Sequence, residues 1–178
     1  MSERSLAVGA RAPEFALQTA DGTTVTLSAF RGQHVVLYYY PKDDTPGCTK
    51  EACSFQAHRA ALRAAQAVVL GVSRDSVASH ERFAGKYQLT FPLLSDPDAS
   101  VCKAYGVFKQ KSLYGRTYWG IERTTFLIDQ DGRVTRIFPK VSVDGHTEEI
   151  LKALKTTSSA SASAPRRTAS ASARTRSR

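Results

Sequence analysis

The feature that most constrains the fold is a strand–helix–strand pattern in the first half of the chain. Residues 34–40 are rich in β-branched and aromatic side chains, which is typical of a strand buried on both faces. A helical stretch follows at residues 48–66, and residues 68–73 form a second apolar run. Two buried strands joined by a helix indicate an α/β domain in which helices pack against a sheet.

The rest of the body continues this alternation of strands and helices. Two Asp-Gly pairs, at residues 21–22 and 131–132, lie between strand-like segments, and each predicts a β-hairpin. The remaining segments predict a helix at 76–87, a strand at 91–94, a short helix at 98–105 and a closing helix at 147–155. This order predicts a thioredoxin-like α/β fold: a mixed central sheet flanked by helices on both faces, with the N-terminal β-hairpin as an addition.

The composition changes at residue 155, which marks the expected end of the folded domain. Residues 156–178 contain five arginines but no acidic residue and no large apolar residue. Such a segment cannot bury enough surface to offset its ordering entropy. We therefore predict a domain at 1–155 and a disordered, basic, Ser/Ala-rich tail at 156–178.

The distribution of charge gives little support for a nucleic-acid-binding domain. Of the 25 basic residues, 20 belong to the body, which also holds all 16 acidic ones, so the body contributes only +4 to the net charge of +9. We favour a solubilising tail. A weak, salt-dependent contact with nucleic acid and a localisation or modification role around residues 166–170 stay open.

The cysteine and histidine pattern argues against a disulfide scaffold and against a metal site. The chain has three cysteines, no CxxC pair and four scattered histidines, so we predict neither a metal nor an organic cofactor. An odd cysteine count without an N-terminal apolar signal segment favours a reducing compartment. We expect a cytoplasmic location, with a nucleoid or nuclear one left open by the tail. The longest apolar run, at residues 35–40, is too short for a membrane span.

The segment after the first buried strand carries the candidate nucleophile. It reads Tyr-Pro-Lys-Asp-Asp-Thr-Pro-Gly-Cys-Thr-Lys-Glu-Ala-Cys over residues 40–53. Thr45 is a favourable N-cap and Pro46 suits the first helical position, which puts Cys48 in the first turn. The unpaired N–H groups and the positive end of the helix dipole lie there, and both favour a thiolate over a thiol. Local physics therefore indicates Cys48 as the nucleophile.

The spacing of the second cysteine restricts how it can react with the first. Cys53 lies five residues after Cys48, which in a helix is about 140° around the axis and about 7.5 Å along it. A disulfide needs Cα atoms within about 7 Å and side chains that face each other. A bond between Cys48 and Cys53 would therefore require the start of the helix to unwind. For Cys102, beside apolar residues, core packing is the favoured interpretation, with an alternative resolving role left open.

The motif around Cys48 closely resembles the active-site motif of the peroxiredoxins. Pro41-x3-Thr45-x2-Cys48 matches it, and the longer string is similar to the peroxiredoxin Q subgroup, also called bacterioferritin comigratory protein. A second similarity is Gly-Ile-Glu-Arg-Thr-Thr-Phe-Leu-Ile-Asp at residues 120–129, where the family places its catalytic arginine. The resemblance covers residues 5–155.

The resemblance implies a thioredoxin-dependent thiol peroxidase that reduces hydrogen peroxide and organic hydroperoxides. Cys48 would be the peroxidatic cysteine, which becomes a sulfenic acid, and Cys53 the resolving cysteine, which forms a disulfide with it. Thr45 would hydrogen-bond the sulfur and the peroxide, and Pro41 would shield the sulfenic acid from water. Arg123 would stabilise the thiolate and orient the peroxide.

Several residues near the motif have two interpretations that the sequence leaves open. Glu51 could be a surface helix charge or could orient Arg123. Asp43 and Asp44, as adjacent acids in a loop, are expected to be solvated. The histidines are expected to be solvated or structural, because a thiolate needs no histidine base.

The sequence also leaves alternatives at the level of the whole protein. Tyr118 and Trp119 could be core residues or an apolar wall around the peroxide. A peroxide-sensing switch, with a tail that tethers it to nucleic acid, is the main rival function; a disulfide reductase is disfavoured because CxxC is absent. We expect a monomer, because no long exposed apolar strand indicates an obligate interface.

Overall fold

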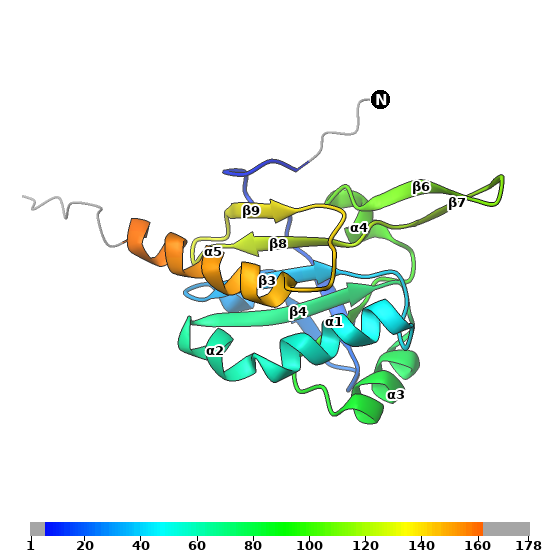
Figure 1. The fold of residues 1–178 in the computed structure, drawn as a ribbon, viewed down its shortest axis with the longest axis horizontal. Helices are drawn as coiled ribbons and strands as arrows, with labels where there is room; N and C mark the ends of the chain where they lie inside the picture. The colour runs from blue at the N-terminus through cyan, green and yellow to red at the C-terminus, as the bar shows by residue number, and fades with distance from the viewer. Residues whose placement is uncertain (1–5, 162–178) are drawn as a thin grey trace, which may run out of the picture.

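The computed structural model describes residues 6–161 and places most of the strands in one seven-stranded sheet (Figure 1). In spatial order these strands are β2 (Thr24–Thr26), β1 (Ala16–Thr19), β5 (Leu93–Ser95), β4 (Ala67–Ser73), β3 (His34–Tyr39), β8 (Thr124–Ile128) and β9 (Val134–Phe138).

The sheet is mixed, as predicted. β3 runs parallel to β4 and β4 parallel to β5, whereas β8 and β9 add antiparallel on the other side. The predicted N-terminal hairpin is β1–β2, which joins the sheet through an antiparallel pairing of β1 with β5. All six residues of β3 are buried, because this central strand is covered on both faces.

Helices and turns cover the two faces of the sheet and form two separate apolar cores. Four helices lie on one face: α1 (Pro46–Ala57), α2 (Arg59–Ala64), α3 (Val77–Tyr87) and α5 (His146–Ser161). The short helices α4 (Ser100–Ala104) and η1 (Leu27–Phe30) pack on the other face with the N-terminal segment. The alternating side chains of β3 enter both cores: Val36 and Tyr38 on the first face, Leu37 and Tyr39 on the second. The predicted thioredoxin-like fold is therefore confirmed.

A two-stranded ribbon that the sequence did not predict extends from one end of the body (Figure 1). Its strands are β6 (Phe108–Leu113) and β7 (Arg116–Ile121), and Phe108 stacks on Trp119 with ring centroids 5.7 Å apart. Both faces of the ribbon are largely exposed, so its strands lack the apolar alternation that marks a half-buried strand. Tyr118 is 47% exposed and Trp119 54%, which excludes the core interpretation of these residues. We expected a monomer because no exposed apolar strand was indicated, and the exposure of Tyr118 and Trp119 weakens this reason. The monomer stays a prediction.

Two predicted helix boundaries were wrong. The single helix predicted at 48–66 is broken at His58, whose ring bonds the carbonyl oxygen of Ser54 at 2.8 Å. The closing helix runs to residue 161, so the first six residues of the predicted disordered tail are helical. There Thr156 and Thr157 donate hydroxyl hydrogen bonds to backbone carbonyls four residues earlier, and adding a residue to an existing helix costs little. The tail beyond residue 161 lies outside the described residues.

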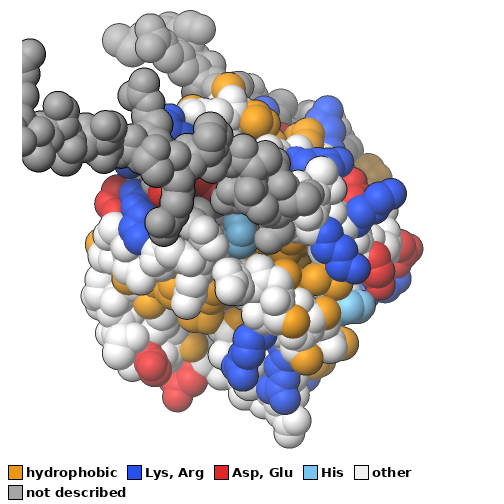
Figure 2. All heavy atoms as spheres, turned by 90° about the vertical axis from the view of Figure 1, so that its left-hand side faces the viewer, with side chains coloured by type: hydrophobic (Ala, Val, Ile, Leu, Met, Phe, Trp, Pro, Cys, Tyr) orange, Lys and Arg blue, Asp and Glu red, His pale blue; other side chains and the backbone are white. Residues whose placement is uncertain are grey.

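Figure 2 shows the side of the molecule at which β3 and β4 begin, and on this face apolar side chains lie among basic ones. One groove is lined by α2, the residues just before β3, the start of β4 and the segment before β5. A second groove lies between α2 and α5. None of the five residues predicted for the active site lines them. Among the described helices, none has the length and apolar character that a membrane span requires.

Candidate active site

The candidate site lies at the carboxyl end of β3, where residues 40–45 lead into α1. Thr45 occupies the N-cap position with extended backbone angles, and Pro46 is the first residue of α1. Cys48 is therefore in the first turn, as predicted. The Thr45 hydroxyl does not cap the helix, because it donates to the carbonyl oxygen of Lys42 at 2.8 Å. Pro41, directly after β3, is exposed.

Arg123 is held against the sulfur of Cys48. Its Nη2 donates to Cys48 Sγ at 3.2 Å, and Cys48 itself is only 2% exposed. The sheet explains this contact, because Thr124 at the start of β8 pairs with Tyr39 at the end of β3. Arg123, one residue before Thr124, therefore lies beside the loop that leads to Cys48. The sequence resemblance implies that Arg123 lies at Cys48, and the structure places the two side chains in contact.

Glu51 fixes the other side of the Arg123 guanidinium. Glu51 is 2% exposed and its Oε1 accepts a hydrogen bond from Arg123 Nη1 at 2.8 Å. This contact settles the alternative that the sequence left open: Glu51 is buried and bonds Arg123. Because burial outweighs the opposing charge of Arg123, the pKa of Glu51 rises to about 7. The second carboxylate oxygen, Oε2, has no hydrogen-bond partner among the described residues.

The surroundings of the Arg123 guanidinium also change its own pKa. Burial alone would lower the pKa of Arg123, but the charges and hydrogen bonds of Glu51 and Cys48 raise it overall. Gly47 contributes through its lack of a side chain, because a Cβ there would stand 3.2 Å from Arg123 Nη2. A side chain at this position would therefore push the guanidinium away by a few tenths of an ångström, and the glycine avoids this shift.

A second cation near the site was missed by the sequence analysis. Lys111 of the β6–β7 ribbon donates to the carbonyl oxygen of Ile121, and it interacts electrostatically with both Arg123 and Cys48. Burial is the main cause that lowers the pKa of Lys111, and the charge of Arg123 adds to it. In the sequence, Lys111 is marked only by lying shortly before the Arg123 motif. That position indicates a place near the site only when β6 and β7 are known to pair.

The other two cysteines lie in different surroundings. Cys53 is half-buried and lines a hollow between α1 and the end of α3, together with Tyr87 and Thr90. Since α1 is an intact helix through both cysteines, Cys48 and Cys53 are unbonded. Cys102 is fully buried in the core on the opposite face of the sheet, where burial raises its pKa far above the usual range. Its core-packing interpretation is confirmed.

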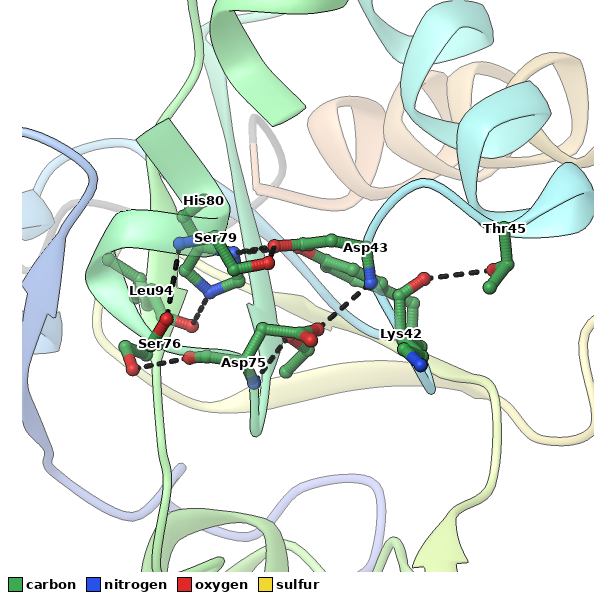
Figure 3. Close-up of polar contacts among 11 residues, drawn as sticks. Lys42, Asp43, Thr45, Asp75, Ser76, Ser79, His80 and Leu94 are labelled. Atoms are coloured by element: carbon green, nitrogen blue, oxygen red, sulfur yellow. Dashed lines mark hydrogen bonds and ion pairs between the residues drawn. The ribbon is translucent and has the colours of Figure 1, made fainter. Parts of the chain in front are cut away.

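The expectation that Asp43 is solvated was wrong. Asp43 is buried and binds His80, which is also buried, at 2.6 Å (Figure 3). Sequence reasoning missed this pair because the two residues are 37 positions apart and meet only when α3 packs beside the loop. Asp44, in contrast, is exposed as predicted, with bonds to Lys86 and Tyr87.

A thioredoxin-like fold with a buried cysteine at a helix start, bonded by an arginine, defines a thiol-dependent peroxidase. Residues 8–137 match the AhpC/TSA family. The chain belongs to this family, and it is accordingly a peroxiredoxin.

Relatives of known name agree with this assignment. The chain is 52% identical over 147 residues to a putative peroxiredoxin bcp of Coxiella burnetii, covering 83% of this chain and 97% of the relative. It is 44% identical over 150 residues to peroxiredoxin Bcp of Escherichia coli, covering 84% and 96%.

Solved structures agree as well. A bacterioferritin comigratory protein of Xanthomonas campestris, described for its alkyl peroxide reduction activity, superposes with a TM-score of 0.79 at 44% identity, covering 85% of this chain and 97% of that one. A peroxiredoxin Q mutant of Xylella fastidiosa gives a TM-score of 0.82 at 42% identity, covering 86% and 98%.

Glu51 is expected to make the stability of the fold depend on pH. Its pKa in the folded chain, about 7, lies above the 4.5 of an unperturbed glutamate, so the folded state holds the proton more tightly than the unfolded state. The stability from this group is complete below about pH 4.5 and is lost as pH rises toward 7, by roughly 3 kcal/mol at most. Glu51→Gln should remove this loss, and urea unfolding at several pH values between 4.5 and 8 measures it.

The matched control is Glu81→Gln on an exposed position of α3, which should keep the pH dependence of the wild type. An unchanged pH profile for Glu51→Gln would show that Glu51 is ionised throughout this range.

Proposed function

We propose that Cys48 reduces hydroperoxides by direct attack of its thiolate on the O–O bond. The observation that carries this proposal is the pair of hydrogen bonds from one guanidinium, Arg123, to Cys48 and to Glu51. The sulfur takes the terminal oxygen of the peroxide and becomes a sulfenic acid, while the second oxygen leaves as an alcohol or water after gaining a proton. The guanidinium donates to the sulfur before the reaction and to the polarised peroxide oxygens during it.

The flanking residues support the same step in the proposal. Thr45 lies three residues before Cys48. Its hydroxyl would hydrogen-bond the peroxide once it no longer donates to the Lys42 carbonyl. Pro41 directly precedes the loop and has no N–H to donate, and its proposed role is to limit the access of water to the sulfenic acid. Lys111 adds a second positive charge on the ribbon side of the sulfur.

The second step of the proposal joins Cys53 to the oxidised Cys48. The Cys53 thiolate attacks the sulfenic sulfur, a disulfide forms and the hydroxyl leaves as water. Because the two cysteines are five positions apart on an intact helix, α1 has to unwind before this bond can form. A dithiol protein of the thioredoxin type then attacks the disulfide and leaves both cysteines reduced, as expected in the cytoplasm.

The proposed substrates include alkyl hydroperoxides as well as hydrogen peroxide. The X. campestris relative reduces alkyl peroxides, and the ribbon of this chain carries exposed apolar side chains at Leu113, Tyr114 and Tyr118. We propose that this apolar surface on the ribbon favours a peroxide with an organic group over a fully polar one.

The proposal is tested by peroxide consumption coupled to thioredoxin, thioredoxin reductase and NADPH. We expect many turnovers per chain with hydrogen peroxide and with tert-butyl hydroperoxide. Oxidation of a single equivalent, with no further NADPH loss under any dithiol reductant, would instead indicate the peroxide-sensing switch. Absence of any reaction between Cys48 and peroxide would contradict both functions.

A further inference from the structure

A buried polar cluster lies behind the loop that leads to Cys48, at the meeting point of three elements (Figure 3). Asp43 comes from the loop after β3, and His80 comes from α3. The side chain of His80 is fully buried and that of Asp43 is 4% exposed, with 2.6 Å between His80 Nδ1 and Asp43 Oδ2. The other ring nitrogen of His80 lies 3.0 Å from the carbonyl oxygen of Leu94 in β5. One imidazole ring therefore connects the loop, α3 and the sheet.

Both oxygens of the Asp43 carboxylate are hydrogen-bonded. Its Oδ1 accepts from the Tyr40 hydroxyl at 2.6 Å, and its Oδ2 accepts from the Ser79 hydroxyl at 2.9 Å in addition to facing His80. The backbone N–H of Asp43 donates to the Asp75 carboxylate at 2.9 Å. Both the side chain and the backbone of Asp43 are thus fixed.

The protonation of the pair follows from its partners. The Leu94 carbonyl can only accept, so His80 Nε2 carries a proton and donates it. His80 Nδ1 and Asp43 Oδ2, 2.6 Å apart, are within hydrogen-bond distance of each other. Asp43, Asp75 and His80 lie close enough to hold a cation, but both His80 nitrogens and both Asp43 oxygens are already hydrogen-bonded. This arrangement favours a structural connection over a metal site.

The loop needs such a connection because of its backbone. Asp44 has a backbone φ of 55°, in the left-handed region that residues other than glycine seldom adopt. Conformations of this kind persist where surrounding contacts hold them. The exposed bonds of Asp44 to Lys86 and Tyr87 compete with water, so the buried Asp43–His80 pair is the stronger restraint.

We propose that Asp43 and His80 are positioning residues for the peroxide reaction: their buried pair fixes residues 41–45, and with them the start of α1 and Cys48, to α3. The inference rests on the proposed function, since it concerns the same two chemical steps. It assigns to the pair the task of keeping the loop in place while the part of α1 after Cys48 unwinds.

The C-terminal half of α1 has its own attachment, and this defines the segment that has to move. Gln56 and Thr90 exchange hydrogen bonds of 2.9 and 3.0 Å. Between Asp43 and Gln56 lie both reacting cysteines and Glu51. Arg123 also holds this segment through Cys48 and Glu51, and Ser54 holds it through Thr147. Loss of the Asp43 attachment would remove the restraint at the loop end, so Cys48 would be misplaced for the peroxide step and the start of α1 would unwind more easily for the disulfide step.

The test measures the two steps separately in an Asp43→Asn variant. Rapid mixing with one equivalent of hydrogen peroxide, followed by quenching, gives the rate of peroxide loss. The rate of disulfide formation comes from thiol counts on the same samples. We expect peroxide loss to slow about tenfold, since misplacement of a reacting group by about 1 Å can cost up to 10²-fold. We expect disulfide formation to become faster.

Two matched variants separate positioning from loss of stability. Asp44→Asn changes the neighbouring, exposed acid and should leave both rates within about twofold of the wild type. Asp96→Asn changes another fully buried acid, which accepts from the backbone N–H of Cys102 at 2.8 Å on the other face of the sheet. It should lower the unfolding midpoint without slowing peroxide loss.

Milder variants keep the proposal testable if Asp43→Asn does not fold. Ser79→Ala and Tyr40→Phe each remove one hydrogen bond to Asp43 and retain its pairing with His80, and both should slow peroxide loss by a few-fold. The proposal is overturned if these variants, or a folded Asp43→Asn, lose peroxide at the wild-type rate. It is also overturned if both steps slow together. A wild-type chain that does not react with peroxide would instead refute the proposed function.

Discussion

A Cys53→Ser variant is expected to consume one equivalent of peroxide per chain and then stop, in the presence of thioredoxin, thioredoxin reductase and NADPH. The wild type should continue for many turnovers under the same conditions. Cys48 and its contact with Arg123 remain intact in the variant, so the first oxidation should proceed at close to the wild-type rate. Without a second thiol, the oxidised Cys48 has no partner within the chain to form a disulfide.

The burial of Cys48 explains why the variant should stall. At 2% exposure, the sulfenic form stays enclosed by the helix start and is poorly accessible to an external protein thiol. Cys102 does not substitute for Cys53, because it lies in the core on the other face of the sheet. Only under a large excess of peroxide should the stalled form take up a second equivalent, in a slower step that gives the sulfinic acid, which mass spectrometry detects.

Cys48→Ser and Cys102→Ser complete the comparison. Cys48→Ser should consume no peroxide above the background, whereas Cys102→Ser should turn over like the wild type. Sustained turnover by Cys53→Ser with thioredoxin would remove the resolving role from Cys53 and transfer it to an external thiol.

The disulfide step also predicts a visible difference between the reduced and oxidised chains. In the reduced state α1 is helical from Pro46 to Ala57. Because the bond cannot form across an intact helix, the amide signals of residues 46–56 should change most on oxidation.

Local sequence signals were enough to predict most of the sheet and the position of Cys48. The Val-rich run of β4 and the aromatic run of β3 are buried on both faces, so their composition alone marks them as central strands. The Thr-Pro-Gly start likewise places Cys48 in the first turn of α1, since proline is suited to the first position of a helix.

Features that depend on contacts between distant segments could not be predicted in this way. Asp43 reads as a loop acid, and only the packing of α3 reveals its buried pair with His80. The sequence left Glu51 open between a surface helix charge and a partner that orients Arg123, and only the neighbouring strands β3 and β8 bring Arg123 to it. The β6–β7 ribbon buries little apolar surface, so its sequence lacks the pattern that reveals a strand.

The second large effect is expected for Arg123→Lys, which keeps the positive charge but changes its geometry. The guanidinium reaches Cys48 through Nη2 and Glu51 through Nη1 at the same time. A lysine ammonium is a compact point charge on a flexible chain and cannot donate in two fixed directions from one plane. Removal of one well-placed donor at a reacting centre typically costs about 10²–10³-fold in rate. We therefore expect kcat/KM for peroxide to fall by about that factor.

The control is Arg136→Lys on an exposed position of β9, away from Cys48, which should leave kcat/KM within about twofold of the wild type. Rapid mixing with hydrogen peroxide resolves the affected step, because Arg123→Lys should slow peroxide loss far more than the later disulfide bond formation. If Arg123→Lys instead reacted within a few-fold of the wild type, positive charge alone would suffice. The pair of hydrogen bonds that connects Arg123 to Cys48 and Glu51 would then serve mainly to hold α1 against β8.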